Sequence, residues 1–210
     1  MSSYIFNLIK QGEHQQLDFK FEISDSRKIA RTLAAFANTD GGKLLIGVKD
    51  NGKIAGVRSD EEYYMLEGAS SMYCKPEVKF RVISWKIEGK TVLEVDVEKN
   101  ENEKHYCQDE SGKWLIYVRV ADQNILASTM LLRFWKMQKQ EKPIFIKYSR
   151  SEKILIDYLH ENKEISISKF CKIAQITNKT AEDVILNLMV LQMIDIKFDE
   201  TKTVYFLANR

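Results

Sequence analysis

The chain has 210 residues, of which 44% are hydrophobic and 30% charged, with 32 basic and 30 acidic side chains. This composition can fill the cores of one or two domains, and it excludes a collagen-like or wholly disordered chain. A net charge of +2 does not indicate a polyanion binder as a whole, so any basic surface must be local. Three widely spaced cysteines without a CxxC pair, no secretory signal and no long apolar run predict a cytoplasmic protein without a membrane segment.

Helical and strand patterns alternate in the first 60 residues. Apolar spacing predicts a short helix over 4–10, and a second helix over 26–38 begins after a capping residue at 24 or 25. Alternating apolar and polar residues predict a half-buried strand over 17–21, and a continuous apolar run predicts a central strand over 43–48.

The pattern continues to a proline near residue 143. We expect a helix over 60–72, a hairpin over 78–97, a second strand pair over 105–120 and a helix over 126–140. The fold class is therefore α+β, and the first domain is predicted to span residues 1–142.

The tail has a different pattern. Ser149 and Glu152 form a capping box before a helix, and further helices are predicted over 166–174 and 179–191. A hairpin over 194–207 follows. Three helices and a hairpin are the order of a winged helix-turn-helix domain, predicted to span residues 143–210.

Several motifs of the first domain occur together. They are GE and DFK in 12–20, AFANTDGG in 35–42, LIGVKDNG in 45–52 and YVRV in 117–120. Together they resemble the Schlafen AlbA-type domain over about residues 4–135. Similar bacterial proteins join this mixed α/β domain to a C-terminal helix-turn-helix module and are described as DNA-binding transcriptional regulators. The resemblance therefore implies a nucleic-acid-binding regulatory protein.

ATP is not an expected cofactor. A phosphate-cradling loop requires a leading glycine and a Ser or Thr after its lysine. Around Lys43 those positions hold Ala37 and Leu44.

The resemblance also implies a carboxylate trio. In Schlafen proteins that cleave structured RNA, the matching positions are Glu13, Asp18 and Asp50, and the family usually has glutamate where this chain has Asp18. Three carboxylates would be catalytic and would bind Mg²⁺ or Mn²⁺, which prefer oxygen ligands. Each residue also has an ordinary structural interpretation, on a strand's polar face or in a turn. Whether the chain is an enzyme stays open, and the shortened side chain at Asp18 favours a protein that is not one and needs no cofactor.

The predicted recognition helix would place its first turn at base edges. Asn178, Lys179, Thr180 and, farther along, Asn187 are suitable side chains for reading bases. Further cations are candidates for phosphate contacts: Lys169, Lys172, Lys197, Lys202 and Arg119. Arg119 has a second interpretation, as a salt bridge at the end of a strand.

The balanced charge of the tail leaves a protein-interaction role open as an alternative to DNA binding. Residues 149–210 hold nine basic and nine acidic side chains, and Glu182 and Asp183 lie early on the recognition helix. A basic run before this tail is either a solvated helix face or a phosphate-binding one: Arg133, Lys136, Lys139, Lys142 and Lys147. The first hypothesis is a regulator that binds DNA rather than RNA, as a possible homodimer. The alternatives are a metal-dependent endoribonuclease and a winged-helix protein-interaction module.

Overall fold

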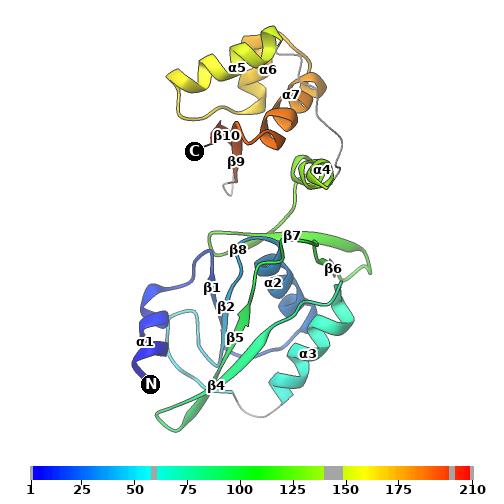
Figure 1. Ribbon diagram of the computed structural model, residues 1–210. Coiled ribbons are helices and arrows are strands. Elements are labelled where there is room, and N and C mark those ends of the chain that lie inside the picture. Colours follow the sequence, from blue (N-terminus) through cyan, green and yellow to red (C-terminus); the bar gives the residue numbers. More distant parts are fainter. Residues whose placement is uncertain (1, 58–60, 140–148, 199–201, 209–210) are drawn as a thin grey trace. The chain divides into compact units, whose positions relative to one another are not determined.

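A computed structural model describes residues 2–57, 61–139, 149–198 and 202–208. The chain forms two compact units, Met1–Ala127 and Ser128–Arg210, called here the N-terminal and C-terminal units (Figure 1). No helix within the described ranges combines the length and the apolar character needed to cross a membrane.

A four-stranded mixed sheet forms the centre of the N-terminal unit. Its strand order is β1 (Leu17–Lys20), β2 (Gly42–Ile46), β5 (Lys90–Val97) and β4 (Arg81–Ile87). β1 pairs parallel with β2, whereas β5 pairs antiparallel with both of its neighbours. The register places Asp18 opposite Leu44.

Helices cover both faces of this sheet (Figure 1). On one face α1 (Ser2–Gln11) packs over β1, β2 and β5, with Ile5 fully buried. On the other face α2 (Ser26–Asn38) and α3 (Glu61–Tyr73) share a core with the sheet. Asp25, one of the two expected capping residues, caps α2 by accepting a hydrogen bond from the Arg27 amide.

A second sheet packs against α2. Its order is β3 (Cys74–Lys75), β6 (Tyr106–Gln108), β7 (Trp114–Val120) and β8 (Gln123–Leu126), all antiparallel. The sequence did not predict β3 or β8. Both are short, and β8 ends at Leu126, the first residue of the helix expected over 126–140.

Asn38 joins the end of α2 to this second sheet. Its side-chain amide donates to the carbonyl oxygens of His105 and Tyr117, both at 2.9 Å, and its oxygen accepts from the His105 amide at 2.7 Å. The side chain is 3% exposed. Because every group is paired, Asn38 fixes the helix against β6 and β7 and is unavailable to a ligand.

The C-terminal unit begins with α4 (Thr129–Gln138), which is capped by Ser128. Three helices follow, α5 (Arg150–Glu161), α6 (Ile167–Ala174) and α7 (Asn178–Val190), and then the antiparallel hairpin of β9 (Ile194–Phe198) and β10 (Thr203–Leu207). The predicted capping box of α5 is present. Fully buried Phe170 of α6 and Ile185 of α7 lie in one common core.

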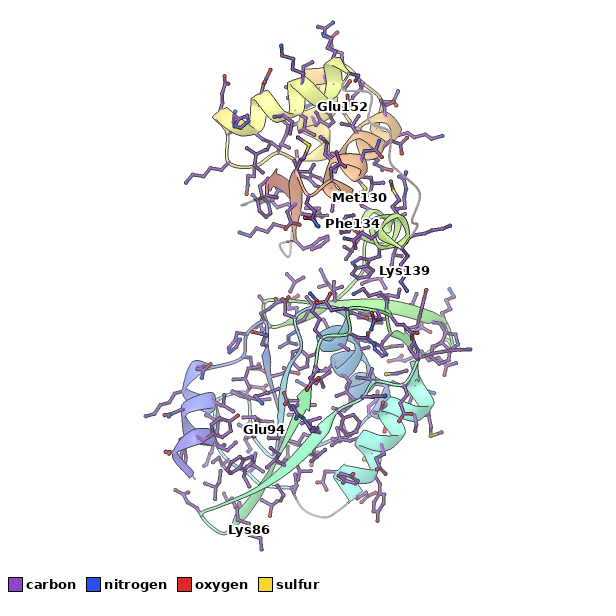
Figure 2. All side chains as sticks on the ribbon, viewed as in Figure 1. Lys86, Glu94, Met130, Phe134, Lys139 and Glu152 are labelled. Carbon is purple, nitrogen blue, oxygen red and sulfur yellow. The ribbon has the colours of Figure 1, made fainter. Side chains whose placement is uncertain are left out.

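Helix α4 belongs to this second core rather than to the first unit. Met130 and the partly buried Phe134 and Met137 join the hydrophobic core that contains residues of α5, α6 and α7. Figure 2 shows Met130 and Phe134 on α4. The units therefore divide between residues 127 and 128, whereas the sequence analysis places a domain boundary between 142 and 143. The difference arises because a helical pattern shows which side is apolar but not which core that side joins. The expected boundary itself lies outside the described residues.

Replacing Asn38 by alanine tests its structural role. We expect Asn38→Ala to lower the free energy of unfolding by about 2–4 kcal/mol, because it leaves buried groups of His105 and Tyr117 without partners. Urea unfolding followed by circular dichroism measures the change. Asn102→Ala, in an exposed loop, serves as the control and should change it by less than about 0.5 kcal/mol. Equal effects of the two substitutions would contradict the role assigned to Asn38.

Candidate functional site

Asp18 lies on β1 inside the N-terminal unit. The residue is 3% exposed, and two cations contact its carboxylate. Arg119 Nη2 lies 3.3 Å from Oδ1, and Lys20 Nζ lies 2.9 Å from Oδ2. Its charge is therefore compensated within the fold, as a buried carboxylate requires.

Arg119 comes from β7 and is itself buried, at 2% exposed. Besides Asp18, its guanidinium donates to the carbonyl oxygens of Leu17 at 3.3 Å and His14 at 3.4 Å, and to Asn124 Oδ1 at 3.1 Å. A phosphate cannot reach a guanidinium in this position. The predicted phosphate contact of Arg119 is therefore corrected, and the salt-bridge interpretation holds.

Glu13 approaches Asp18 from the turn before β1. Its Oε1 accepts a hydrogen bond from the Phe19 amide at 2.9 Å. Burial, together with the neighbouring Asp18 carboxyl, raises the pKa of Glu13 to about 7, and the Phe19 amide opposes that rise. Two carboxyls of the predicted trio therefore do come together, but one of them holds its proton more tightly than an ordinary glutamate does.

Asp50 does not complete a metal site with them. It is exposed in the turn after β2, where the Gly52 amide donates to the Lys49 carbonyl oxygen at 2.7 Å. In the part of the chain that the structure describes, no three His, Cys, Asp or Glu side chains are grouped so that they could hold a metal ion. Asp18 already has two cationic partners, so the predicted Mg²⁺ or Mn²⁺ ligand set does not fit this geometry.

Thr39 also faces inward, at the end of α2. Its hydroxyl donates to the Ala35 carbonyl oxygen at 2.7 Å and accepts from the Arg119 amide at 2.9 Å. The Asn38–Thr39 pair is thus a connection between α2 and β7. Gly41 follows it with φ +71, and a Cβ there would lie 2.8 Å from the Val97 carbonyl oxygen, so the turn into β2 needs glycine.

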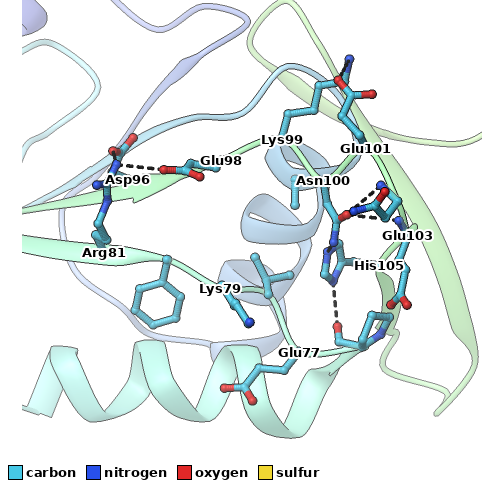
Figure 3. A pocket seen from close by; sticks show the side chains of 15 residues that line it. Glu77, Lys79, Arg81, Asp96, Glu98, Lys99, Asn100, Glu101, Glu103 and His105 are labelled. Carbon is cyan, nitrogen blue, oxygen red and sulfur yellow. Dashed lines mark hydrogen bonds and ion pairs between the residues drawn. The ribbon is translucent and has the colours of Figure 1, made fainter.

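A cleft of about 590 Å³ opens beside the loop after β5 (Figure 3). His105 lines it with both ring nitrogens engaged, Nδ1 with the Pro76 carbonyl oxygen at 2.8 Å and Nε2 with the Asn100 amide at 3.0 Å. Five carboxylates and three basic side chains surround the cleft: Glu77, Asp96, Glu98, Glu101, Glu103, Lys79, Arg81 and Lys99. This excess of negative charge is unfavourable for a polyanion.

The predicted base-contacting residues lie at the surface of the C-terminal unit. Asn178, Lys179 and Thr180 are exposed in the first turn of α7, and Asn187 is half-buried two turns later. Asn178 Nδ2 donates to Glu182 Oε1 at 2.9 Å, which keeps that amide close to the helix.

The predicted phosphate-contacting lysines are exposed as well. Lys169 and Lys172 lie on α6, and Lys197 lies on β9. Lys202, before β10, forms an ion pair with Glu164 Oε1 at 2.6 Å. It is therefore partly neutralised where it stands.

The basic run before the tail has one member with a specific partner pair. Arg133 of α4 places Nη1 2.7 Å from Glu182 Oε2 and Nη2 2.6 Å from Asp183 Oδ1. Lys136 is exposed on the same helix and Lys139 is exposed at its C-cap, whereas Lys142 and Lys147 lie outside the described residues. The local sequence pattern does not reveal this contact, because nothing in it connects α4 with α7.

The raised pKa of Glu13 predicts a pH-dependent contribution to stability. Below its ordinary pKa of 4.5 the group is protonated in both states, and between 4.5 and about 7 the native state retains the proton while the unfolded chain loses it. The stability that this group contributes is therefore lost as the pH rises through about 7. We expect the urea midpoint of the wild type, minus that of Glu13→Gln, to fall between about pH 4.5 and about pH 7. A difference that does not change with pH would contradict the assigned pKa.

Comparison with known proteins identifies a family to which the chain is similar. The family model described as Schlafen, AlbA_2 matches residues 13–128, and no curated protein matches the chain. Among solved structures, the DIP2311 protein from Corynebacterium diphtheriae is 23% identical, with a TM-score of 0.45, over 62% of this chain and 29% of its own length. The N-terminal domain of a RecG-related protein from Nitrosomonas europaea is 19% identical, with a TM-score of 0.44, over 70% of this chain and 97% of its own. Because the family model covers more than half of the 210 residues, the chain belongs to the Schlafen AlbA_2 family.

Proposed function

We propose that this protein binds nucleic acid, specifically duplex DNA, through its C-terminal unit, and that it acts as a DNA-binding regulator. In this proposal α5, α6, α7 and the β9–β10 hairpin form a winged helix, and α7 is the recognition helix. Membership of the Schlafen AlbA_2 family supports a role with nucleic acid. The regulatory role is inferred from the joining of that domain to a helix-turn-helix module.

The arrangement of the C-terminal elements supports the winged-helix assignment. Helices α6 and α7 are joined by a tight turn in which Gln175 has a left-handed conformation, with φ 55. Ile165, between α5 and α6, exchanges two backbone hydrogen bonds of 2.9 Å with Tyr205 of β10. This isolated β-bridge connects the segment between α5 and α6 to the hairpin and holds the hairpin beside the helices.

Charge is distributed unequally between the units. When the chain is divided at residue 128, where the packing divides it, residues 128–210 carry fourteen basic and ten acidic side chains. Residues 1–127 carry eighteen basic and twenty acidic ones. The surplus of positive charge therefore belongs to the C-terminal unit, and phosphate neutralisation supplies much of the affinity for DNA. Residues 149–210 alone have equal numbers of basic and acidic side chains, but that count does not include the basic residues of α4.

The exposed side of α7 is the observation that carries the proposal. Lys179 and Thr180 are exposed, and Asn187, two turns after Lys179 on the same side of the helix, is half-buried, whereas Ala181 and Ile185 are fully buried on the opposite side. Lysine, threonine and asparagine all hydrogen-bond to base edges or phosphates. A helix enters the major groove of B-form DNA, whereas the corresponding groove of A-form RNA is too deep and narrow, so the proposal is DNA.

In the described residues of the N-terminal unit, the geometry of the predicted carboxylates does not favour the ribonuclease alternative. Asp18 is engaged by Arg119 and Lys20, and Asp50 is not grouped with it. The N-terminal unit is instead proposed to support the DNA-binding unit without catalysing a reaction. The protein-interaction alternative remains an outcome of the following test.

The test is a titration of the full chain with a labelled duplex of about 25 base pairs of mixed sequence, followed by fluorescence anisotropy. We expect binding at about 50 mM NaCl that weakens steeply toward about 200 mM, because counterions are released from the phosphates. Lys179→Ala should weaken binding by roughly five- to tenfold, because one contact of the recognition helix is lost.

The matched control is Lys163→Ala, which removes an exposed lysine before α6 in the same unit. It should change affinity by less than about twofold. If the wild type binds no duplex at the lower salt concentration, the proposal fails and a protein-interaction role is favoured. If both lysine variants weaken binding equally, α7 is not the recognition helix.

A further inference from the structure

We propose that Arg133 of α4 is a positioning residue of the DNA interface, and that it neutralises two carboxylates that would otherwise repel the phosphate backbone. The inference rests on the proposed function and extends it. It makes α4 part of the DNA-binding unit, although α4 lies outside the helix-turn-helix element and outside the hairpin.

The acidic pair lies close to the proposed contact residues. Asp183 is one turn after Lys179 and one turn before Asn187, so the three share one side of α7. Asp183 is 49% exposed and Glu182 is 32% exposed, so both are accessible to solvent and to a docked phosphate. Two bare carboxylates at this place would oppose binding of a polyanion.

Arg133 engages both carboxylates with one guanidinium. Each terminal nitrogen contacts a different acid, Nη1 with Glu182 at 2.7 Å and Nη2 with Asp183 at 2.6 Å. The planar fork of arginine makes such a double contact, which a lysine ammonium does not reproduce. Arg133 therefore reduces the local charge of the acids and also limits where their side chains can go.

Packing of α4 holds Arg133 in place. Met130 and Phe134, on either side of it in the helix, are part of the core that includes Ile185, Leu186 and Met189 of α7 (Figure 2). The helix is thus fixed against α7 by apolar contacts independent of the ion pairs. Loss of the guanidinium is therefore expected to alter charge on the recognition helix while leaving the core of the unit intact.

The experiment compares the wild type with three variants of the full chain in the same anisotropy titration at about 50 mM NaCl. Relative to the wild type, we expect Arg133→Ala to bind the duplex roughly tenfold more weakly, because two carboxylates are exposed to the phosphates. Adding Glu182→Gln and Asp183→Asn to Arg133→Ala should restore affinity to within about threefold of the wild type, because the carboxylates no longer carry charge. Arg150→Ala, which removes an exposed arginine from α5, is the matched control and should have a smaller effect than Arg133→Ala.

Each outcome bears on one of the two proposals. If the wild type binds and Arg133→Ala binds equally well, the inference fails while the proposed function stands. If Arg133→Ala binds weakly and removal of the acidic charges does not restore binding, Arg133 does not act through Glu182 and Asp183, which also overturns the inference. If the wild type itself does not bind DNA, the proposed function fails first. Thermal unfolding followed by circular dichroism checks that each variant is folded. If Arg133→Ala does not fold, Arg133→Gln is used in its place, both alone and together with Glu182→Gln and Asp183→Asn.

Discussion

The buried ion pair between Arg119 and Asp18 is the constraint on which the N-terminal unit depends. Arg119 extends from β7 of the second sheet to Asp18 on β1 of the first, and its side chain also bonds to Asn124, whose amide in turn donates to Thr32 of α2 at 2.9 Å. Two sheets and the helix between them are thereby joined by one chain of polar contacts. A buried charge that lost its partner would be costly, so this arrangement leaves Asp18 little freedom to take another role. The family position that could serve as a metal ligand is here part of the framework.

Local signals were sufficient to predict much of the fold. Helix α2 matches its expected bounds because Asp25 begins it, glycine follows it and its apolar spacing is regular. The capping box at Ser149 gives the start of α5, and the hairpin expected over 194–207 agrees with β9 and β10. These elements are specified by neighbours in sequence, so a single chain is enough to locate them.

Features that depend on distant residues could not be predicted in the same way. Alternation in YVRV indicates that Arg119 lies on a strand, but not that its side chain turns inward to Asp18. Asp50 matches a family motif, yet only the turn geometry shows that it stays at the surface away from the other carboxylates. The contact of Arg133 with α7 also joins residues that are distant in sequence, and it pairs two acidic side chains of the C-terminal unit with a cation. The resulting picture is a framework unit followed by a unit proposed to bind DNA.

The most direct measurement is a double-mutant cycle on the Arg119–Asp18 pair. The free energy of unfolding in urea is compared for the wild type, Asp18→Asn, Arg119→Gln and the double variant. If the pair is an internal connection, each single substitution should cost about 3–5 kcal/mol, because it leaves a buried charge without its partner. The double variant should then cost clearly less than the two single effects added together. Additive effects, or single costs below about 1 kcal/mol, would show that Asp18 is free of Arg119 and would contradict this account.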